Sequence, residues 1–344
     1  MSFLRSDESN VPEFEFAYYD MSPYTDIIKL PYPKPGYPNP IVSLGVYDIN
    51  NKITAFVNSS FIGSNDYIYS VQWNNDILYV QYLNRNQTTL NIVTYEGQMN
   101  SQENELFSYS TTDRWIDVFP LVFLNNGNAV TLKAAENEFN HIFNLNTQTF
   151  LTEGDWLVVS INGYNSQSDT LFFTSTEISS ITRHVYSIKS EGTNRKRVTG
   201  DTNDDAYYSV NFDISGEYYV LSYLGPLIPN QYLYSSLNTE FKIELTTNQN
   251  LQNLLANYKL PSIEYGTLPI VGTPNMMIRY PPDFDSSKKY PVLMFVYGGP
   301  DSQQVTKRFD LSFNSYVASQ LGYVVVVVDG RGTGGRGYNY EKYV

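Results

Sequence analysis

The chain contains no cysteine and only two histidines among its 344 residues. Without cysteine it can form no disulfide, no thiolate metal site and no cysteine nucleophile, and this absence suits any cellular compartment. Basic residues are also scarce, because 22 Lys and Arg stand against 35 Asp and Glu and give a formal charge of −13. Such a charge repels nucleic acid and anionic membrane surfaces, so we expect neither as a partner.

Long apolar runs are missing as well. No run approaches the roughly 18 residues that span a bilayer, and the opening "MSFLRSDESNVPEFEF" has no apolar core of a signal peptide, so we expect a soluble chain. Hydrophobic residues nevertheless make up 42% of the sequence and aromatic residues 15%, which is ample for a sizeable core. The length predicts two domains, or one large domain and part of another.

Two Asn-x-Ser/Thr sequons occur in the first hundred residues, at Asn58 and Asn86. Both predict N-glycosylation if the chain enters the secretory pathway. A chain this rich in Asn also produces a couple of sequons by chance, so both interpretations stay open.

The middle of the chain repeats itself. The segments "TLNIVTY", "FNHIFNL", "TRHVYSI" and "NQYLYSS" align with spacings of 50, 43 and 48 residues at the column Ile92, Ile142, Val185 and Leu233. About a dozen residues upstream of each lies a second column, formed by Leu78, Val130, Phe172 and Tyr219. Each residue of the second column follows a turn cluster of the type "NND" or "NNGN".

Short strands, Asn/Asp/Gly turns and a period of 40 to 50 residues are typical of the blades of a β-propeller. Propellers close with about four to eight blades, and the four repeats found here do not fill such a ring. The proline-rich segment 11–48 could contribute a fifth blade. A tandem of β-sandwiches is the alternative that this pattern leaves open.

The pattern changes after a predicted helix in "NQNLQNLLANYKLPS", which Pro261 ends. Beyond it, "PNMMIRYPPDF", "YPVLMFVYGGP" and "YVVVVVDGRG" predict strands, and "FDLSFNSYVASQLG" predicts a helix that ends at Gly322. Strand, helix and strand with continuous apolar runs indicate a parallel sheet covered on both faces. We therefore predict a mostly β protein with a partial β-propeller in residues 1–255 and the first strands of an α/β domain in residues 256–344.

The glycines Gly330, Gly332 and Gly335 satisfy the G-x-G-x-x-G pattern directly after a strand. A dinucleotide site also needs a helix that opens at the last glycine and an acid about twenty residues further on. Neither feature follows here, so we expect no bound nucleotide. We also expect no other cofactor and no metal.

Several segments together resemble a known family. These are "PYPKPGYPNPIVSLGVYD", "YPPDFDSSKKYP", "KKYPVLMFVYGGPDSQQV" and "SYVASQLGYVVVVVDGRGTGGRG". They closely resemble the dipeptidyl peptidase IV family of the prolyl oligopeptidase superfamily, and are nearest to the fungal dipeptidyl aminopeptidases. The resemblance implies an eight-bladed propeller set over an α/β-hydrolase domain, and a serine peptidase that removes Xaa-Pro or Xaa-Ala dipeptides from free amino ends.

Two residues receive a role from this resemblance. Tyr297 in "VYGGP" matches the tyrosine whose hydroxyl donates to the oxyanion, a task that suits a phenol fixed by packing at a strand end. Phe119 in "RWIDVFP" resembles a phenylalanine that lines the substrate pocket, although an ordinary core aromatic fits the sequence equally well. The "DGRG" at Asp329 to Gly332 matches a structural turn at the sheet's exit.

The departures from the family pattern are as informative as the matches. No serine lies in a G-x-S-x-G elbow, and the only histidines, His141 and His184, fall in the repeats, where we expect them to be blade residues with satisfied ring nitrogens. No Ser-Asp-His triad can be assembled in family order. The chain therefore looks like an internal fragment, whose paired glutamates and membrane anchor would lie upstream, and we predict no peptidase activity from it alone.

The remaining expectations follow from the resemblance. A peptide is the expected substrate, a second copy of the chain is a candidate partner, and the location is the lumen of the endomembrane system, with a vacuolar or Golgi membrane in fungal relatives. The alternative is a non-catalytic propeller protein that binds peptides or partner proteins.

Overall fold

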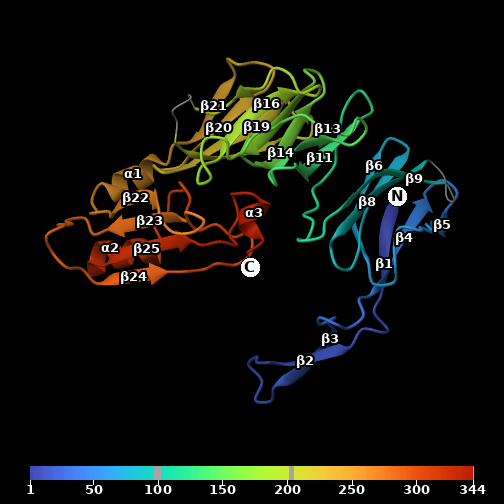
Figure 1. The fold of residues 1–344 in the computed structure, drawn as a ribbon, viewed down its shortest axis with the longest axis horizontal. Helices are drawn as coiled ribbons and strands as arrows, with labels where there is room; N and C mark the ends of the chain where they lie inside the picture. Colours follow the sequence, from blue (N-terminus) through green and yellow to red (C-terminus); the bar gives the residue numbers. More distant parts are fainter. Residues whose placement is uncertain (97–101, 201–204, 344) are drawn as a thin grey trace. The chain divides into compact units, whose positions relative to one another are not determined.

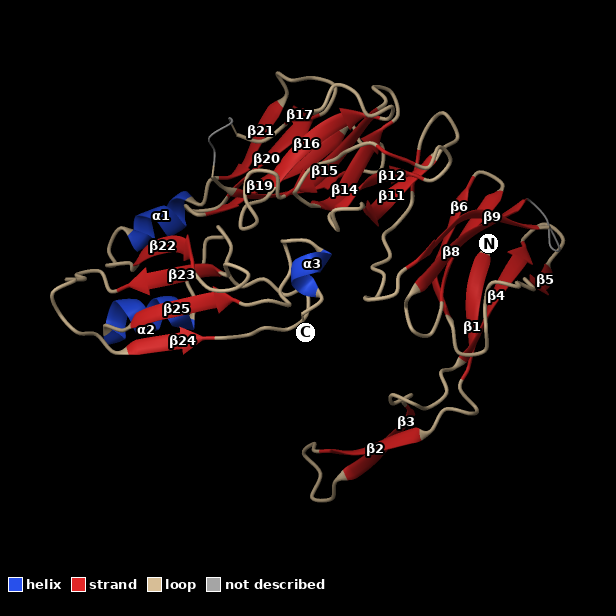
Figure 2. Ribbon diagram, viewed as in Figure 1, coloured by secondary structure: helices blue, strands red, loops and turns tan. Residues whose placement is uncertain are grey.

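A computed structural model describes residues 1–96, 102–200 and 205–343. The chain divides into two compact units, Met1–Leu121 and Val122–Val344. Strands dominate both units, as the sequence predicts (Figures 1 and 2). In the part of the chain that is described, no helix is long and apolar enough to cross a membrane.

The first unit contains one complete four-stranded sheet and two smaller ones. The complete sheet has the order β6-β7-β8-β9, with bounds Tyr67–Asn74, Ile77–Leu83, Thr89–Glu96 and Glu103–Ser110. A three-stranded sheet has the order β1-β4-β5, with bounds Ser2–Asp7, Ile41–Asp48 and Ile53–Phe56. A separate hairpin pairs β2 (Glu13–Tyr18) with β3 (Asp26–Pro31).

Segment 11–48 thus forms a hairpin and one strand of a three-stranded sheet, so it adds one strand to that sheet and does not form a four-stranded blade by itself. The physical reason is its proline content. Pro33, Pro35, Pro38 and Pro40 lie between β3 and β4, where they remove backbone donors that a fourth ladder would need.

The second unit begins with three more four-stranded antiparallel sheets (Figure 1). Strands β10 to β13 have bounds Val122–Phe123, Ala129–Ala134, Asn140–Asn144 and Thr149–Phe150. Strands β14 to β17 have bounds Val158–Asn165, Thr170–Ser175, His184–Lys189 and Lys196–Arg197. Strands β18 to β21 have bounds Tyr207–Phe212, Tyr218–Gly225, Asn230–Ser235 and Lys242–Thr246.

These sheets confirm the predicted blades. The column of Ile92, Ile142, Val185 and Leu233 falls on the third strand of each sheet, and the column of Leu78, Val130, Phe172 and Tyr219 falls on the second. The turn clusters supply the left-handed residues that tight antiparallel turns need, with positive φ at Asn75, Gly127, Asp169 and Gly216. Most of the column residues are buried, so the repeat in the sequence is a repeat of core positions.

A mixed sheet with three short helices follows the blades. Its order is β22-β23-β25-β24, with bounds Ser262–Thr267, Asn275–Tyr280, Val324–Asp329 and Val292–Phe295. Helix α1 spans Gln249–Leu255, α2 spans Phe313–Leu321 and α3 spans Tyr338–Glu341. Helices α1 and α2 confirm the two predicted helices, and α2 ends at Gly322 with φ 72°, the left-handed cap that glycine favours.

The prediction of a parallel sheet covered on both faces is only partly right. β24 and β25 are parallel, but β23 runs antiparallel to both β22 and β25. The short connection between β22 and β23 permits only an antiparallel hairpin, whereas the crossover through α2 is long enough for a parallel pair. β24 is also an exposed edge strand, with Val292 62% and Met294 58% exposed.

The two histidines lie in equivalent places in neighbouring blades. His141 of β12 and His184 of β16 are fully buried, and the Nδ1 of each lies 3.1 Å from a threonine Oγ1, that of Thr152 or Thr199. The same hydroxyl accepts the backbone N–H of the next residue, Ile142 or Val185, at 3.0 Å. The prediction of satisfied blade histidines is confirmed.

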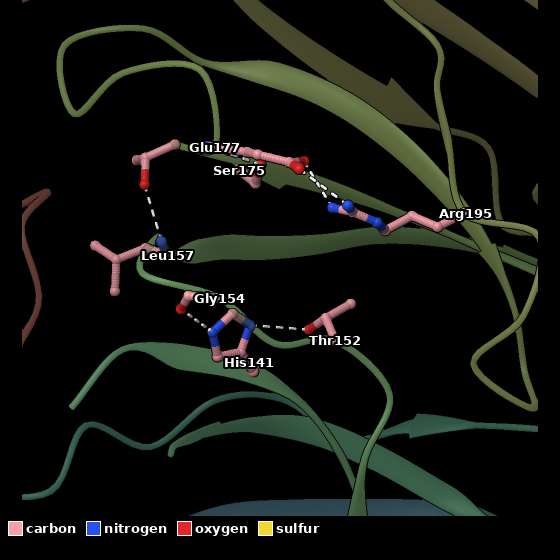
Figure 3. Close-up of polar contacts among 8 residues, drawn as sticks. His141, Thr152, Gly154, Leu157, Ser175, Glu177 and Arg195 are labelled. Atoms are coloured by element: carbon pink, nitrogen blue, oxygen red, sulfur yellow. Dashed lines mark hydrogen bonds and ion pairs between the residues drawn. The ribbon is translucent and has the colours of Figure 1, made fainter. Parts of the chain in front are cut away.

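His141 is held neutral by its surroundings. Its Nε2 lies 3.0 Å from the carbonyl oxygen of Gly154 and must donate there, so Nδ1 accepts the proton of the Thr152 hydroxyl (Figure 3). Burial lowers the pKa of His141 from its ordinary 6.5, and the Gly154 carbonyl offsets only part of that effect. The nearby Arg195, which is paired bidentately with Glu177, acts in the same direction as burial (Figure 3).

The second unit is expected to lose stability in acid through His141. Because its pKa is lower in the folded chain than the ordinary 6.5, the unfolded chain binds the proton more tightly, and the free energy of unfolding falls as the pH drops below 6.5. Urea unfolding between pH 7.5 and 5 should show a smaller loss in His141→Gln than in the unchanged chain. Equal slopes for both chains would contradict this assignment.

Gly225 is predicted to be intolerant of any side chain. Its φ is +155°, and a Cβ there would lie 2.3 Å from both the Lys307 oxygen and the Phe309 nitrogen. Gly225→Ala should therefore lower the free energy of unfolding by about 2 kcal/mol or more. Gly266→Ala is the matched control, because its Cβ would meet only Met276 at 3.9 Å. Equal stability of the two variants would show that the backbone at Gly225 yields easily.

Candidate functional site

The candidate site lies where β24 and β25 end at the same edge of the mixed sheet. Tyr297, Gly298 and Gly299 follow β24, and the Asp329 to Gly332 turn follows the parallel neighbour β25. Carboxyl ends of parallel strands are where α/β sheets place their chemistry. The two loops after these strands therefore form the site that the sequence predicts.

The loop after β24 is tied to the loop after β25 by backbone hydrogen bonds. Asp301 N–H donates to the Gly332 oxygen at 3.2 Å, and Gly334 N–H donates to the Ser302 oxygen at 3.0 Å. The approach is close enough that a Cβ on Gly334 would lie 2.6 Å from the Asp301 backbone oxygen. The two glycine-rich loops consequently hold one another in place.

Asp329 fixes the segment that follows the Tyr297 loop. Asp329 is 3% exposed, and its carboxylate accepts the backbone N–H of Val305 at 2.8 Å and of Gln304 at 3.0 and 3.1 Å. Burial raises the pKa of Asp329, while the two N–H donors act in the opposite direction. Its role in this structure is to hold the loop, which agrees with the structural turn expected for "DGRG".

The same segment continues onto the blades of the second unit. Gln303 accepts from Arg183 Nη2 at 2.7 Å and donates to the Ser180 oxygen at 2.8 Å. Lys307 N–H donates to the Ile181 oxygen, and Phe309 N–H donates to the Leu224 oxygen. Residues 303–309 thus form a strap between the sheet and two blades, which the sequence did not indicate because glutamine and backbone contacts leave no motif.

Tyr297 itself is not fixed in the way the sequence suggests. β24 ends at Phe295, and the Tyr297 side chain is 63% exposed, beside Gly299. Within the described residues its hydroxyl has no hydrogen-bond partner, so the phenol remains available as a donor. The expectation of a donor held by packing is not met, because β24 is an uncovered edge strand.

The other predicted residues lie in the first unit. Phe119 is half-buried, and its carbonyl oxygen accepts from the Gln81 side chain at 3.1 Å. Asn58 and Asn86 are exposed and lie outside the strands, as an N-glycan requires. No cluster of three or more His, Asp or Glu residues that could hold a metal ion occurs in residues 1–96, 102–200 and 205–343.

Removing the Asp329 carboxylate should release the strap. Asp329→Ala leaves the buried N–H groups of Gln304 and Val305 without an acceptor, so the free energy of unfolding should fall by about 2 to 4 kcal/mol, and Asp329→Asn should cost less. Urea unfolding measures both values. Asp283→Ala is the control, since Asp283 makes only an exposed ion pair with Lys259. A cost for Asp329→Ala no larger than for this control would contradict the role of Asp329.

Comparison with known proteins agrees with this architecture. Residues 1–230 match the family model of the dipeptidyl peptidase IV (DPP IV) N-terminal region. The probable dipeptidyl-aminopeptidase B of Arthroderma otae is 35% identical over 100% of this chain and 41% of its own length. The corresponding protein of Sclerotinia sclerotiorum is 34% identical over 97% of this chain and 40% of its own length.

A solved structure extends the likeness to the fold. The crystal structure of Porphyromonas gingivalis dipeptidyl peptidase 4 matches with a TM-score of 0.90 and 29% identity, over 99% of this chain and 49% of that chain. This chain spans less than half the length of each of these relatives. The blades, the mixed sheet and the family match together show that the chain belongs to the dipeptidyl peptidase IV family, within which it comprises propeller blades and the first strands of the following α/β domain.

Proposed function

We propose that this chain supplies propeller blades and an oxyanion donor of a serine dipeptidyl aminopeptidase, and that residues 1–344 alone do not catalyse the reaction. The substrate would be a peptide with a free amino end, from which Xaa-Pro or Xaa-Ala is released. Residues 1–255 would form the propeller part and residues 256–344 the beginning of the peptidase domain.

The observation that carries the proposed inactivity is the state of the histidines. A serine hydrolase needs a histidine whose nitrogen can reach the nucleophile. His141 and His184 are fully buried inside blades, and both nitrogens of His141 are engaged by Thr152 and Gly154. The sequence also offers no serine in a G-x-S-x-G elbow.

Tyr297 and Phe119 are the residues proposed to meet the substrate. Tyr297 would donate its hydroxyl to the oxyanion that develops on the scissile carbonyl, and its position after the parallel strand β24, with a hydroxyl that no other described residue engages, supports this role. Phe119 would line the substrate pocket.

The proposal extends to partners and location. The chain would act in the lumen of the endomembrane system, such as the vacuole or Golgi, carry glycans at Asn58 and Asn86, and reach a membrane only through an upstream anchor. A second copy of the chain is proposed as a partner. The hairpin of β2 and β3 exposes Phe14, Phe16 and Tyr18, an apolar surface that such a copy could cover.

Hydrolysis of Gly-Pro-p-nitroanilide tests the proposal. The purified 344-residue chain should release no p-nitroaniline above the buffer rate, and the product of the complete reading frame should release it. In that longer product, Tyr297→Phe should lower kcat by about 10²- to 10³-fold, because one oxyanion donor is lost. Tyr316→Phe is the matched control, since Tyr316 is an exposed tyrosine that lies on helix α2 and not in a loop after a parallel strand.

Two outcomes would contradict the proposal. Turnover by the 344-residue chain would show that a nucleophile and base are present in it. A complete reading frame without activity, together with a folded and monodisperse 344-residue product, would favour the non-catalytic binding protein instead.

A further inference from the structure

A cavity of about 870 Å³ in the second unit is lined in part by the strap of residues 303–309. One wall is apolar and comes from the mixed sheet and α2, with Leu293, Phe295 and Phe313. The other walls include Arg183, Arg279 and Gln303. The volume falls in the range of small-molecule sites, which combine an apolar lining with a few polar groups.

Arg279 in the wall of this cavity is buried, and two of its three guanidinium nitrogens have no hydrogen-bond acceptor in the described part of the chain. The side chain is 3% exposed, and its Nη2 donates to Asp310 Oδ2 at 2.7 Å. Its Nε and Nη1 atoms have no hydrogen-bond acceptor among the described residues. A guanidinium remains charged at all ordinary pH values, so buried N–H groups without acceptors are costly and a second acceptor would stabilise them.

The cavity wall carries a net positive charge, whereas the whole chain is negatively charged. The wall's charged residues are Arg183, Arg279 and Arg308 on one side and Asp310 on the other, whereas the chain as a whole carries −13. Arg183 already donates to the carbonyl oxygens of Ser180 and Thr182 and to Gln303. Arg279 is therefore the residue of this wall whose buried N–H groups still lack an acceptor among the residues that the structure describes.

We propose that this cavity binds a carboxylate attached to an apolar body. The carboxylate would accept hydrogen bonds from Arg279 on the side that Asp310 leaves open, and the body would contact Leu293, Phe295 and Phe313. A guanidinium matches a planar carboxylate with two parallel N–H bonds. A dianionic phosphate fits less well, because the buried Arg183 already donates to Thr182 and Gln303. The phosphate oxygens would then have too few hydrogen-bond donors. The inference does not depend on the proposed peptidase function.

Calorimetric titration of the 344-residue chain with N-acetyl-L-phenylalanine tests the proposal, with N-acetyl-L-phenylalaninamide as the uncharged comparison. The acid should bind saturably and at least about tenfold more tightly than the amide, since a hydrogen bond to a charged group separates them. Equal affinities, or no binding of either compound, would overturn the proposal.

Three variants assign the effect to Arg279. Arg279→Met keeps much of the side-chain volume and should abolish the preference for the acid. Asp310→Asn removes the competing carboxylate and should tighten acid binding, a result that stays informative if Arg279→Met fails to fold. Arg331→Met is the control, because Arg331 lies over the Tyr343 ring and is not part of the cavity wall. An unchanged preference in both Arg279→Met and Asp310→Asn would overturn the assignment.

The carboxylate can come from a free ligand or from an acidic side chain of a longer polypeptide. The same titration on the product of the complete reading frame separates the two sources. Binding in both proteins identifies a free ligand, and binding in the 344-residue chain alone identifies an internal acidic side chain. Absence of acid binding in both proteins contradicts the site itself.

Discussion

The second unit depends on one buried carboxylate. Asp329 ends the central strand β25 and accepts the N–H groups of Gln304 and Val305, so a single side chain fixes where the strap leaves the candidate site. The strap then reaches Ile181 and Leu224 of the blades through Lys307 and Phe309. Buried N–H groups without acceptors cost free energy, which is why these bonds set the path of the chain. The cavity beside Arg279 and the close approach at Gly225 both lie along that path.

The sequence predicted the parts of the fold that repeat along the chain or that show a strong pattern of apolar residues. Positions such as Ile142 and Val185 recur because each blade needs a buried residue at the same place on its third strand, so the period is visible without a structure. Helix α2 could be placed because Gly322 is a glycine cap, and the family motifs located Tyr297 and Asp329 at strand ends. The buried histidines could be predicted because both occur at the same point of the repeat.

Other features depend on contacts between distant residues and left no pattern in the sequence. The antiparallel pairing of β23 depends on the hairpin from β22, although its apolar composition resembles that of a parallel strand. Whether a strand is covered depends on its neighbours, so the exposure of β24 and of Tyr297 could not be deduced from apolar residues alone. Arg279 belongs to no motif, and its missing acceptors become visible only when Asp310 and the cavity are placed around it.

Native-state amide hydrogen exchange tests most directly the claim that the strap joins the sheet to the blades of the second unit. The amides of Val305, Lys307 and Phe309 are hydrogen-bonded to Asp329, Ile181 and Leu224, so they should open with the same free energy as the amide of Val185 in a blade core. Exchange of the three strap amides several orders of magnitude faster than that of Val185 would contradict the account, because the sheet and the blades would then open independently.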